Sequence, residues 1–193
     1  MILITGFEPF TTGQGLRLEH NPTADIVPRV ARRIAGAHSA VLPVSFRDTK
    51  SSLLAHFEEH RPTAWIGLGY APHRVTLDIE TLAVNIEHAT SPDNTGETPW
   101  MRPVIEGAPP ALRTRLDMQE AVATFARHEV VATPAFHAGT FLCNQSFYLG
   151  CHAVENEGPL AMAVFIHVPP MQSYQAFEDG LVALANGLPA TQA

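Results

Sequence analysis

Cysteine is scarce in this sequence, which has only Cys143 and Cys151 among its 193 residues. If both lie on one helix, their Cα atoms are about 12 Å apart at 1.5 Å per residue, whereas a disulfide spans at most about 7 Å. We therefore expect no intrachain disulfide. Two free thiols indicate a reducing compartment, so we expect a cytoplasmic protein.

Long apolar runs and clusters of basic residues are also absent. No segment reaches the roughly 20 apolar residues of a membrane helix, and the first residues lack the basic start and cleavage site of a signal peptide. The net charge of -7 argues against a nucleic-acid or anionic-membrane surface. We therefore expect a soluble protein whose partners are neither nucleic acids nor membranes.

Internal repeats, low-complexity linkers and the common nucleotide-binding motifs are missing as well. Gly67-Leu68-Gly69 lacks the third glycine of a dinucleotide fingerprint, and neither a P-loop nor a G-x-S-x-G elbow occurs. We therefore expect no cofactor. Without a break in composition, residues 1–193 are expected to form a single domain.

What the sequence does contain is a regular alternation of strand-like and helix-like segments. Residues 91–110, rich in Pro, Gly and Asn, should form a long loop or lid, and Pro28 should kink its helix or delay the helix start. The alternation predicts a three-layer α/β/α fold, with an open, largely parallel twisted sheet and helices on both faces. Strands are expected near residues 2–5, 40–44, 65–69, 74–86, 130–132 and 160–168, and helices near residues 23–34, 49–60, 116–125, 143–154 and 174–184.

Cys143 has the most informative position in the chain. It follows the small turn Ala138-Gly139-Thr140 and begins a segment with helical apolar spacing. A thiol at a helix start lies over free backbone N–H groups, which should lower its pKa and favour the nucleophilic thiolate. Cys151, expected in mid-helix, is better suited to a buried structural role.

Two further residues could complete a nucleophilic site with Cys143. His167 ends the most apolar strand, so in a parallel sheet it should lie at the same edge as the thiol. Glu80, isolated among apolar residues, is the carboxylate that could orient the imidazole. Taken singly, each residue also fits a purely structural role. Cys143 could be a small buried apolar residue, His167 a hydrogen-bonded structural histidine, and Glu80 a charge on an edge strand that prevents aggregation.

A metallohydrolase is the competing enzyme class, because His56-Phe57-Glu58-Glu59-His60 has the H-x-x-E-H form. The segment is short, and such matches arise by chance in a chain with ten histidines. Histidines also suit the negative end of a helix. We therefore expect no metal site, although zinc at unit stoichiometry would favour the metal interpretation.

Four groups of motifs, in order over nearly the whole chain, resemble the pyroglutamyl peptidase I (pyrrolidone-carboxylate peptidase) family of cysteine peptidases. The resemblance implies that Cys143, His167 and Glu80 form a triad that removes N-terminal pyroglutamate from peptides through an acyl-enzyme. It also implies a homodimer or homotetramer. The motifs are Ile4-Thr5-Gly6-Phe7-Glu8-Pro9-Phe10 with Asn21-Pro22-Thr23, Glu80-Thr81-Leu82-Ala83-Val84-Asn85-Ile86 with Pro92-Asp93-Asn94-Thr95-Gly96, Ala138-Gly139-Thr140-Phe141-Leu142-Cys143-Asn144 with Phe147-Tyr148, and Phe165-Ile166-His167-Val168-Pro169.

The substrate pocket implied by this resemblance should be small and mostly apolar, because the pyrrolidone ring is flat and neutral. Phe10, Phe141 and Leu142 are candidate walls of the pocket. Asn21 is a candidate polar contact to the ring.

Several positions depart from the family pattern. Tyr70 stands where the family has a glutamine that helps to recognise the ring, and Thr81 and Thr90 stand where it has arginines. Ser91 replaces a bulky apolar residue. These changes motivate a second interpretation: a non-catalytic or re-specialised relative that binds a small amide ligand.

Overall fold

The computed structural model describes residues 1–12, 15–156 and 158–188. Its main sheet has six strands in the order β2-β1-β3-β8-β4-β7, and β5 and β6 form a separate antiparallel pair. Among the six strands, β4 and β8 are the one antiparallel pair of neighbours; the other neighbours run parallel. The strands are β1 (Ile2–Phe7), β2 (Ala37–Leu42), β3 (Ala64–Tyr70), β4 (Leu77–Glu80), β5 (Leu82–Val84), β6 (Ala111–Arg113), β7 (Ala132–Ala135) and β8 (Met162–Val168).

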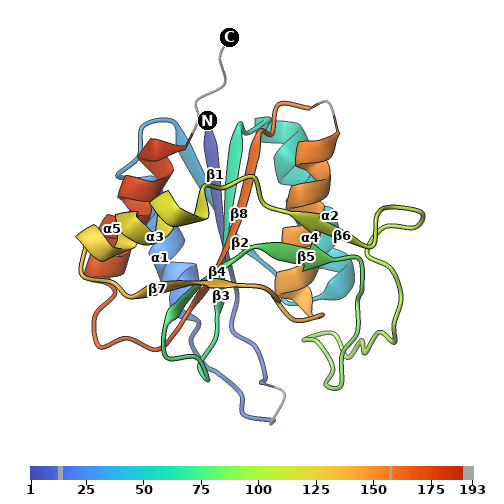
Figure 1. Ribbon diagram of the computed structural model, residues 1–193. Coiled ribbons are helices and arrows are strands. Elements are labelled where there is room, and N and C mark those ends of the chain that lie inside the picture. Colours follow the sequence, from blue (N-terminus) through green and yellow to red (C-terminus); the bar gives the residue numbers. More distant parts are fainter. Residues whose placement is uncertain (13–14, 157, 189–193) are drawn as a thin grey trace.

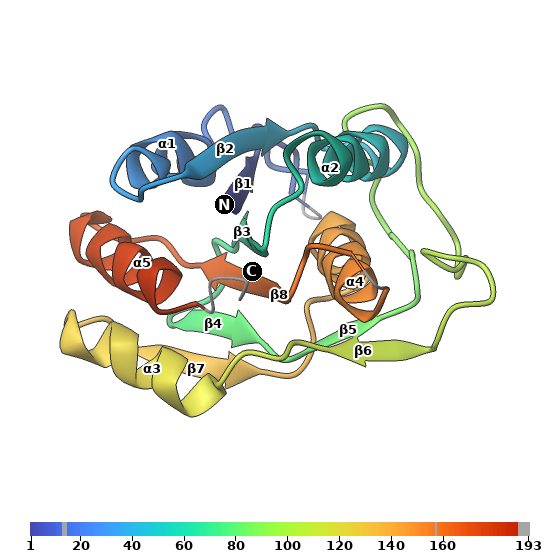
Figure 2. The same cartoon turned by 90° about the horizontal axis from the view of Figure 1, so that it is seen from above.

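Helices cover both faces of the sheet, as Figure 1 and the view from above in Figure 2 show. One face carries α1 (Pro22–Ala31), α3 (Met118–Arg127) and α5 (Gln175–Gly187). The other face carries α2 (Phe46–His60) and α4 (Leu142–Glu155). The predicted α/β/α fold with a largely parallel sheet is confirmed.

The two faces of the sheet hold two apolar clusters. Ile26, Phe125 and Phe177 belong to the cluster under α1, α3 and α5, whereas Trp65 and Phe147 belong to the cluster under α2 and α4. Because helices cover both faces, the central strand β8 is buried at every residue and appears in the sequence as a continuous apolar run. Within the described residues, no helix is both long and apolar enough to cross a membrane.

Two predicted boundaries are wrong, and one of the two expected effects of Pro28 does not occur. Of the two effects expected of Pro28, a kink or a late helix start, the late start does not occur: the helix begins at Pro22, since Pro suits the first helical turn and the Asn21 side chain accepts a hydrogen bond from Thr23 N. The next helix begins earlier than predicted, at Phe46, where the Ser45 side chain accepts a hydrogen bond from Asp48 N. The expected strand over residues 74–86 is divided into β4 and β5.

The long loop predicted over residues 91–110 is tied to the helices beneath it. The Asp93 carboxylate accepts a hydrogen bond of 2.8 Å from Phe46 N at the start of α2. Farther along, Asn85 pairs with the Ile105 backbone in both directions, and the Tyr148 hydroxyl donates to Pro109 O at 2.6 Å. The segment is therefore an anchored loop on the side of α2 and α4.

Candidate active site

The carboxyl ends of β3 and β8 place Gly69 and His167 at one edge of the sheet, and β4, which runs antiparallel to β8, places Glu80 next to them. His167 has Gly69 as its parallel register partner in β3 and Asp78 as its antiparallel partner in β4. The start of α4, with Cys143 as its second residue, reaches the same edge. The three predicted catalytic residues therefore meet, although they come from three different elements.

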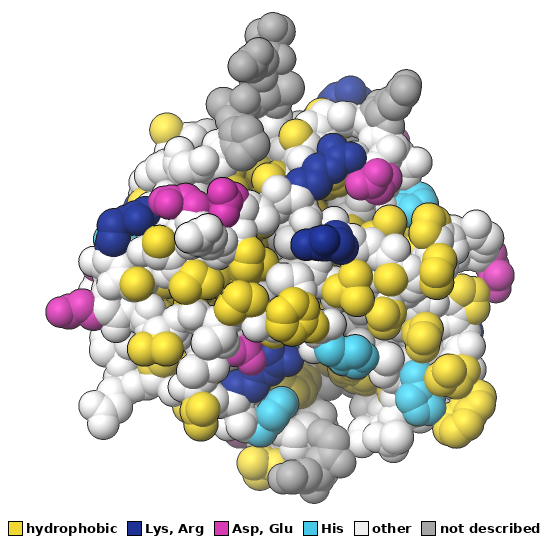
Figure 3. Space-filling view, in the orientation of Figure 1, with side chains coloured by type: hydrophobic (Ala, Val, Ile, Leu, Met, Phe, Trp, Pro, Cys, Tyr) yellow, Lys and Arg dark blue, Asp and Glu magenta, His cyan; other side chains and the backbone are white. Residues whose placement is uncertain are grey.

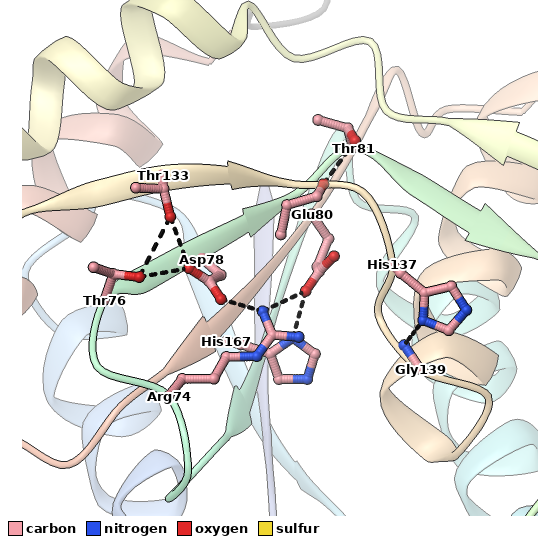
Figure 4. Close-up of polar contacts among 10 residues, drawn as sticks. Arg74, Thr76, Asp78, Glu80, Thr81, Thr133, His137, Gly139 and His167 are labelled. Carbon is pink, nitrogen blue, oxygen red and sulfur yellow. Dashed lines mark hydrogen bonds and ion pairs between the residues drawn. The ribbon is translucent and has the colours of Figure 1, made fainter.

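His167 and Glu80 form a buried contact, with 2.7 Å between His167 Nδ1 and Glu80 Oε1 (Figure 4). This contact occupies Nδ1 and leaves Nε2 of the imidazole for a substrate or the thiol. Burial lowers the pKa of His167, and this effect outweighs the opposing effect of the Glu80 carboxylate. The imidazole is therefore neutral at pH 7 and can accept a proton.

Arg74 and Asp78 extend this contact into a network that the sequence analysis missed. Arg74 Nη1 lies 3.0 Å from Glu80 Oε1 and also donates to Asp78 Oδ2 (Figure 4). Thr76 and Thr133 hydroxyls donate to the other Asp78 oxygen. The alternation of Asp78 and Glu80 on one side of β4 was the available signal, because residues two apart in a strand share a face.

The pKa of Asp78 reflects the same network. Burial pushes this pKa upward, but the hydrogen bonds from Thr133, Thr76 and Arg74 and the charge of Arg74 outweigh burial and lower it overall. Asp78 therefore stays ionised beside Arg74. The guanidinium bridges two carboxylates, which fixes the carboxylate that holds His167.

The Cys143 thiol lies beside the same imidazole. A Cβ placed on Gly69 would be 2.8 Å from Cys143 Sγ and 3.1 Å from His167 Cδ2. Cys143 Sγ and His167 Cδ2 can therefore be no farther apart than these two distances added together. Glycine at position 69 is therefore what allows the thiol and the ring to approach each other.

The predicted lowering of the Cys143 pKa is wrong for the free protein. Burial raises the pKa of the thiol to about 12, and the nearby Glu80 charge adds to this effect, while Arg74 and the Cys143 backbone N–H oppose it. The position at the helix start is as predicted, but burial and the Glu80 charge outweigh the charge of Arg74 and the Cys143 backbone N–H. The thiol is therefore protonated until a base takes its proton.

The start of α4 is held in place by polar side chains on its buried side. Asn144 accepts a hydrogen bond from Val84 N and donates to Val84 O, each at 2.9 Å, as a neighbouring strand would. Gln145 donates to Phe46 O at 2.8 Å. In the preceding turn, Gly139 has a φ of 82° and donates its N–H to His137 Nδ1 (Figure 4). These contacts fix where the thiol points.

A pocket of about 240 Å³ opens beside the thiol and the imidazole. All five residues predicted to contact the substrate line it: Phe10, Asn21, Tyr70, Phe141 and Leu142. Asn21 is already engaged, because its Oδ1 caps α1 and its Nδ2 donates to Glu8 O at 3.0 Å. Only one N–H of this amide is left for a ligand.

The positions that depart from the family pattern fall in different places. Tyr70 lines the pocket, whereas Thr90 and Ser91 line an adjacent cavity that shares Phe10 and Phe141 with it. Thr81 is outside both cavities, and its hydroxyl donates to Ala135 O at 2.7 Å. Arg74 lines the pocket and supplies a cation there.

Comparisons with known proteins identify the family of this chain. The family model described as pyroglutamyl peptidase matches residues 1–185. A pyrrolidone-carboxylate peptidase of Thermococcus onnurineus is 37% identical over 170 residues, which are 87% of this chain and 82% of the relative. A pyrrolidone-carboxylate peptidase of Gloeobacter violaceus is 37% identical over 171 residues, 87% of this chain and 80% of the relative. The solved pyrrolidone carboxyl peptidase of Thermococcus litoralis has a TM-score of 0.87 at 31% identity, covering 96% of this chain and 91% of that one. The chain therefore belongs to the pyroglutamyl peptidase family.

Proposed function

We propose that this protein is a cysteine exopeptidase that removes N-terminal pyroglutamate from peptides, with Cys143 as nucleophile, His167 as acid and base, and Glu80 as the orienting carboxylate. The observation that carries the proposal is the buried 2.7 Å contact between Glu80 and His167 beside the Cys143 thiol. A thiol, an imidazole and a group that orients the imidazole are the parts that acyl transfer through a cysteine requires.

Acylation begins with transfer of the thiol proton to Nε2 of His167. As the proton leaves, Cys143 Sγ bonds to the carbonyl carbon between pyroglutamate and the next residue, and the carbonyl electron pair moves to oxygen. The raised pKa of Cys143 and the lowered pKa of His167 make this a transfer between neutral groups, concerted with attack. When the C–N bond breaks, His167 returns the proton to the leaving amine, and a thioester remains.

Deacylation repeats the sequence with water. His167 takes a proton from water as the oxygen attacks the thioester carbonyl, and then protonates the sulfur as the C–S bond breaks. Among the residues that the structure describes, no side chain caps the start of α4, so the backbone N–H groups there, including that of Cys143, can donate to the negative oxygen of each tetrahedral intermediate. Removal of one such donor from an acyl-transfer site typically costs about 2.7–4 kcal/mol of transition-state stabilisation.

The shape and chemistry of the pocket favour a small, uncharged ring. Its walls include Phe10, Phe141 and Leu142, and it has few uncommitted polar groups. The remaining Asn21 N–H and the Tyr70 hydroxyl can meet the carbonyl oxygen and N–H of a lactam. Tyr70 is the residue in this pocket that departs from the family pattern, so it is the position at which ring specificity can differ.

The test is release of fluorophore from a pyroglutamyl-aminomethylcoumarin substrate under reducing conditions, with wild type and Cys143→Ser compared. Turnover by the wild type alone is expected. Turnover by both proteins would exclude Cys143 as the nucleophile. If neither protein releases the fluorophore and both have the circular dichroism spectrum of a folded protein, the second interpretation is favoured: a relative that binds a small amide ligand without hydrolysing pyroglutamyl peptides.

A chemical probe separates these two functions further. An aldehyde or chloromethyl-ketone analogue of pyroglutamate should form an adduct on Cys143 that intact-mass analysis detects. An inactive protein that still forms the adduct has a competent thiol with altered substrate choice. A protein without turnover or adduct is a non-catalytic relative.

We also propose a homodimer or homotetramer in the cytoplasm. Hydrophobic side chains form a band over the face that contains β7, β5 and β6 (Figure 3). Beside β7, Val131 and Phe136 are 71% and 72% exposed, which is unusual for large apolar residues. Sedimentation velocity should give a mass of two or four chains; a monomer at micromolar concentration would contradict this proposal.

A further inference from the structure

Three histidines from two elements meet on the α2 side of the sheet. His56 and His60 are one helical turn apart in the last part of α2, so they share a face of that helix. His38 is the second residue of β2, an edge strand, and pairs with Leu3 of β1. The H-x-x-E-H pattern therefore acquires a third imidazole from a position 18 residues earlier in the chain.

The three rings are close enough to share one ligand. One nitrogen from each ring can be chosen so that all three lie within 4.8 Å of one another. The ring centroids of His38 and His60 are 4.1 Å apart, and those of His56 and His60 are 5.5 Å apart and stacked. Nitrogens bound tetrahedrally at 2.0–2.1 Å are about 3.3–3.4 Å apart, so small side-chain rotations would close the site around a metal ion.

Two features of the cluster favour a metal ligand. His56 Nδ1 is buried and has no hydrogen-bond partner among the described residues, so this ring keeps a free nitrogen. In addition, a Glu59 oxygen lies 3.9 Å from His60 Nε2 and supplies a carboxylate beside the cluster.

We propose that His38, His56 and His60 bind a divalent transition-metal ion, with zinc(II) as the reference ion. Three imidazoles without a thiolate suit zinc, copper and nickel, and leave at least one coordination position for water or Glu59. The proposed metal site shares no residue with the proposed peptidase site and does not depend on its chemistry.

The position of the site indicates its effect. In the parallel register, His38 and Leu3 lie level with Trp65 and Ala163, and His167 is four residues farther along β8. The metal site is therefore toward the amino ends of the strands, and the thiol is at the carboxyl ends. A metal bound there would join the edge strand β2 to the end of α2 and stabilise the folded state, because the unfolded chain does not hold the three rings together.

The experiment is zinc titration by calorimetry on chelator-treated Cys143→Ser protein, which removes the catalytic thiol as a competing zinc ligand. One zinc per chain and an upward shift of the melting temperature are expected. Cobalt(II) should give the visible absorption of a nitrogen-ligated site of low coordination number. His38→Ala, His56→Ala and His60→Ala should each weaken zinc binding by at least about 100-fold, since even a lost outer-shell partner costs 10–100-fold.

His20→Ala is the matched control, because the His20 side chain is 65% exposed and pairs with Asp25 rather than with the cluster. It should leave zinc affinity unchanged. If the Cys143→Ser protein binds no zinc, or if it binds zinc equally well with His38 and His60 replaced, the proposal is wrong. Circular dichroism of each metal-free variant checks that a loss of zinc binding is not a loss of folding. Because His38 lies in an edge strand, His38→Ala should disturb the fold least of the three variants.

Discussion

Gly69 lies directly beside His167 in the register of β3 and β8, and the space left by its missing side chain brings the Cys143 thiol to the imidazole. A strand residue of any other type would place a Cβ within 2.8 Å of the sulfur. The proposed nucleophile and base therefore depend on a residue that contributes no chemical group of its own.

Gly69→Ala should abolish or strongly reduce turnover, because the new methyl group would displace the thiol or the ring, and a displacement of about 1 Å can cost 100-fold in rate. The kcat for a pyroglutamyl substrate checks this. Gly187→Ala is the control, since a Cβ there meets nothing within 4 Å. Equal activity of Gly69→Ala and wild type would contradict the geometry described for the thiol.

Cys143→Ala and Cys143→Ser should abolish turnover while the protein stays folded, because the reaction needs the sulfur. Cys151→Ser is the matched thiol control: Cys151 is buried in α4, among the apolar residues under α2 and α4. This variant should keep kcat/KM near the wild-type value per folded molecule, with any loss confined to the melting temperature. Loss of activity in Cys151→Ser comparable to that in Cys143→Ser would show that the nucleophile is misassigned.

Glu80→Gln should lower kcat by roughly 100- to 10,000-fold and leave measurable activity, since the thiol and imidazole remain but the orienting charge is lost. The Glu80 charge raises the pKa of His167, so its removal should also move the acid limb of the pH profile of kcat/KM to lower pH. An unchanged profile and rate would exclude Glu80 as the partner of the base.

Arg74→Gln should move the acid limb the other way, to higher pH, because the Arg74 charge lowers the pKa of His167. The rate should fall as well, since the guanidinium fixes Glu80 from its position between two carboxylates. Arg74→Lys keeps the charge and should restore the pH profile more than the rate. Arg115→Gln, which removes an exposed ion pair with Glu155, should change neither.

The pH dependence of wild type has a defined sign. The pKa of His167 is lowered, so its imidazole should stay neutral at pH values somewhat below the ordinary histidine pKa of about 6.5. Over that pH range kcat/KM should therefore keep its plateau value. The unfolded chain takes up this proton at about pH 6.5, so the free energy of unfolding should fall as the pH drops from there to the folded pKa. Urea denaturation at several pH values, compared with His167→Gln, measures this contribution; an acid limb above pH 6.5 would contradict the assignment.

The fold could be predicted because a buried parallel sheet leaves a strong pattern in the chain. Continuous apolar runs such as β8 and the amphipathic helices between them predict the layers without any knowledge of the contacts. The errors lie at the ends of elements, where local hydrogen bonds determine the first and last residue. The cap at Ser45 starts its helix earlier than the apolar spacing indicates, and one strand-like segment is divided into β4 and β5.

The residues of the candidate site divide in the same way. Cys143 and His167 could be selected because each stands at the start or end of an element, and Glu80 because it is isolated among apolar residues; all three also lie within family motifs. Arg74 was missed, since it lies in a turn and its role depends on reaching across to Asp78 and Glu80. Residue type and spacing do not show such contacts.

Residue order was enough to predict the layered α/β fold, because that fold depends on local periodicity, and to select Cys143, His167 and Glu80 as the candidate reactive groups. Only the folded chain decided the protonation of those groups and the meeting of distant side chains. Burial and the Glu80 charge raise the pKa of Cys143, and the packing of α2 against β2 brings His60 to His38. Both results depend on which atoms surround a group in space, which no local pattern in the sequence specifies.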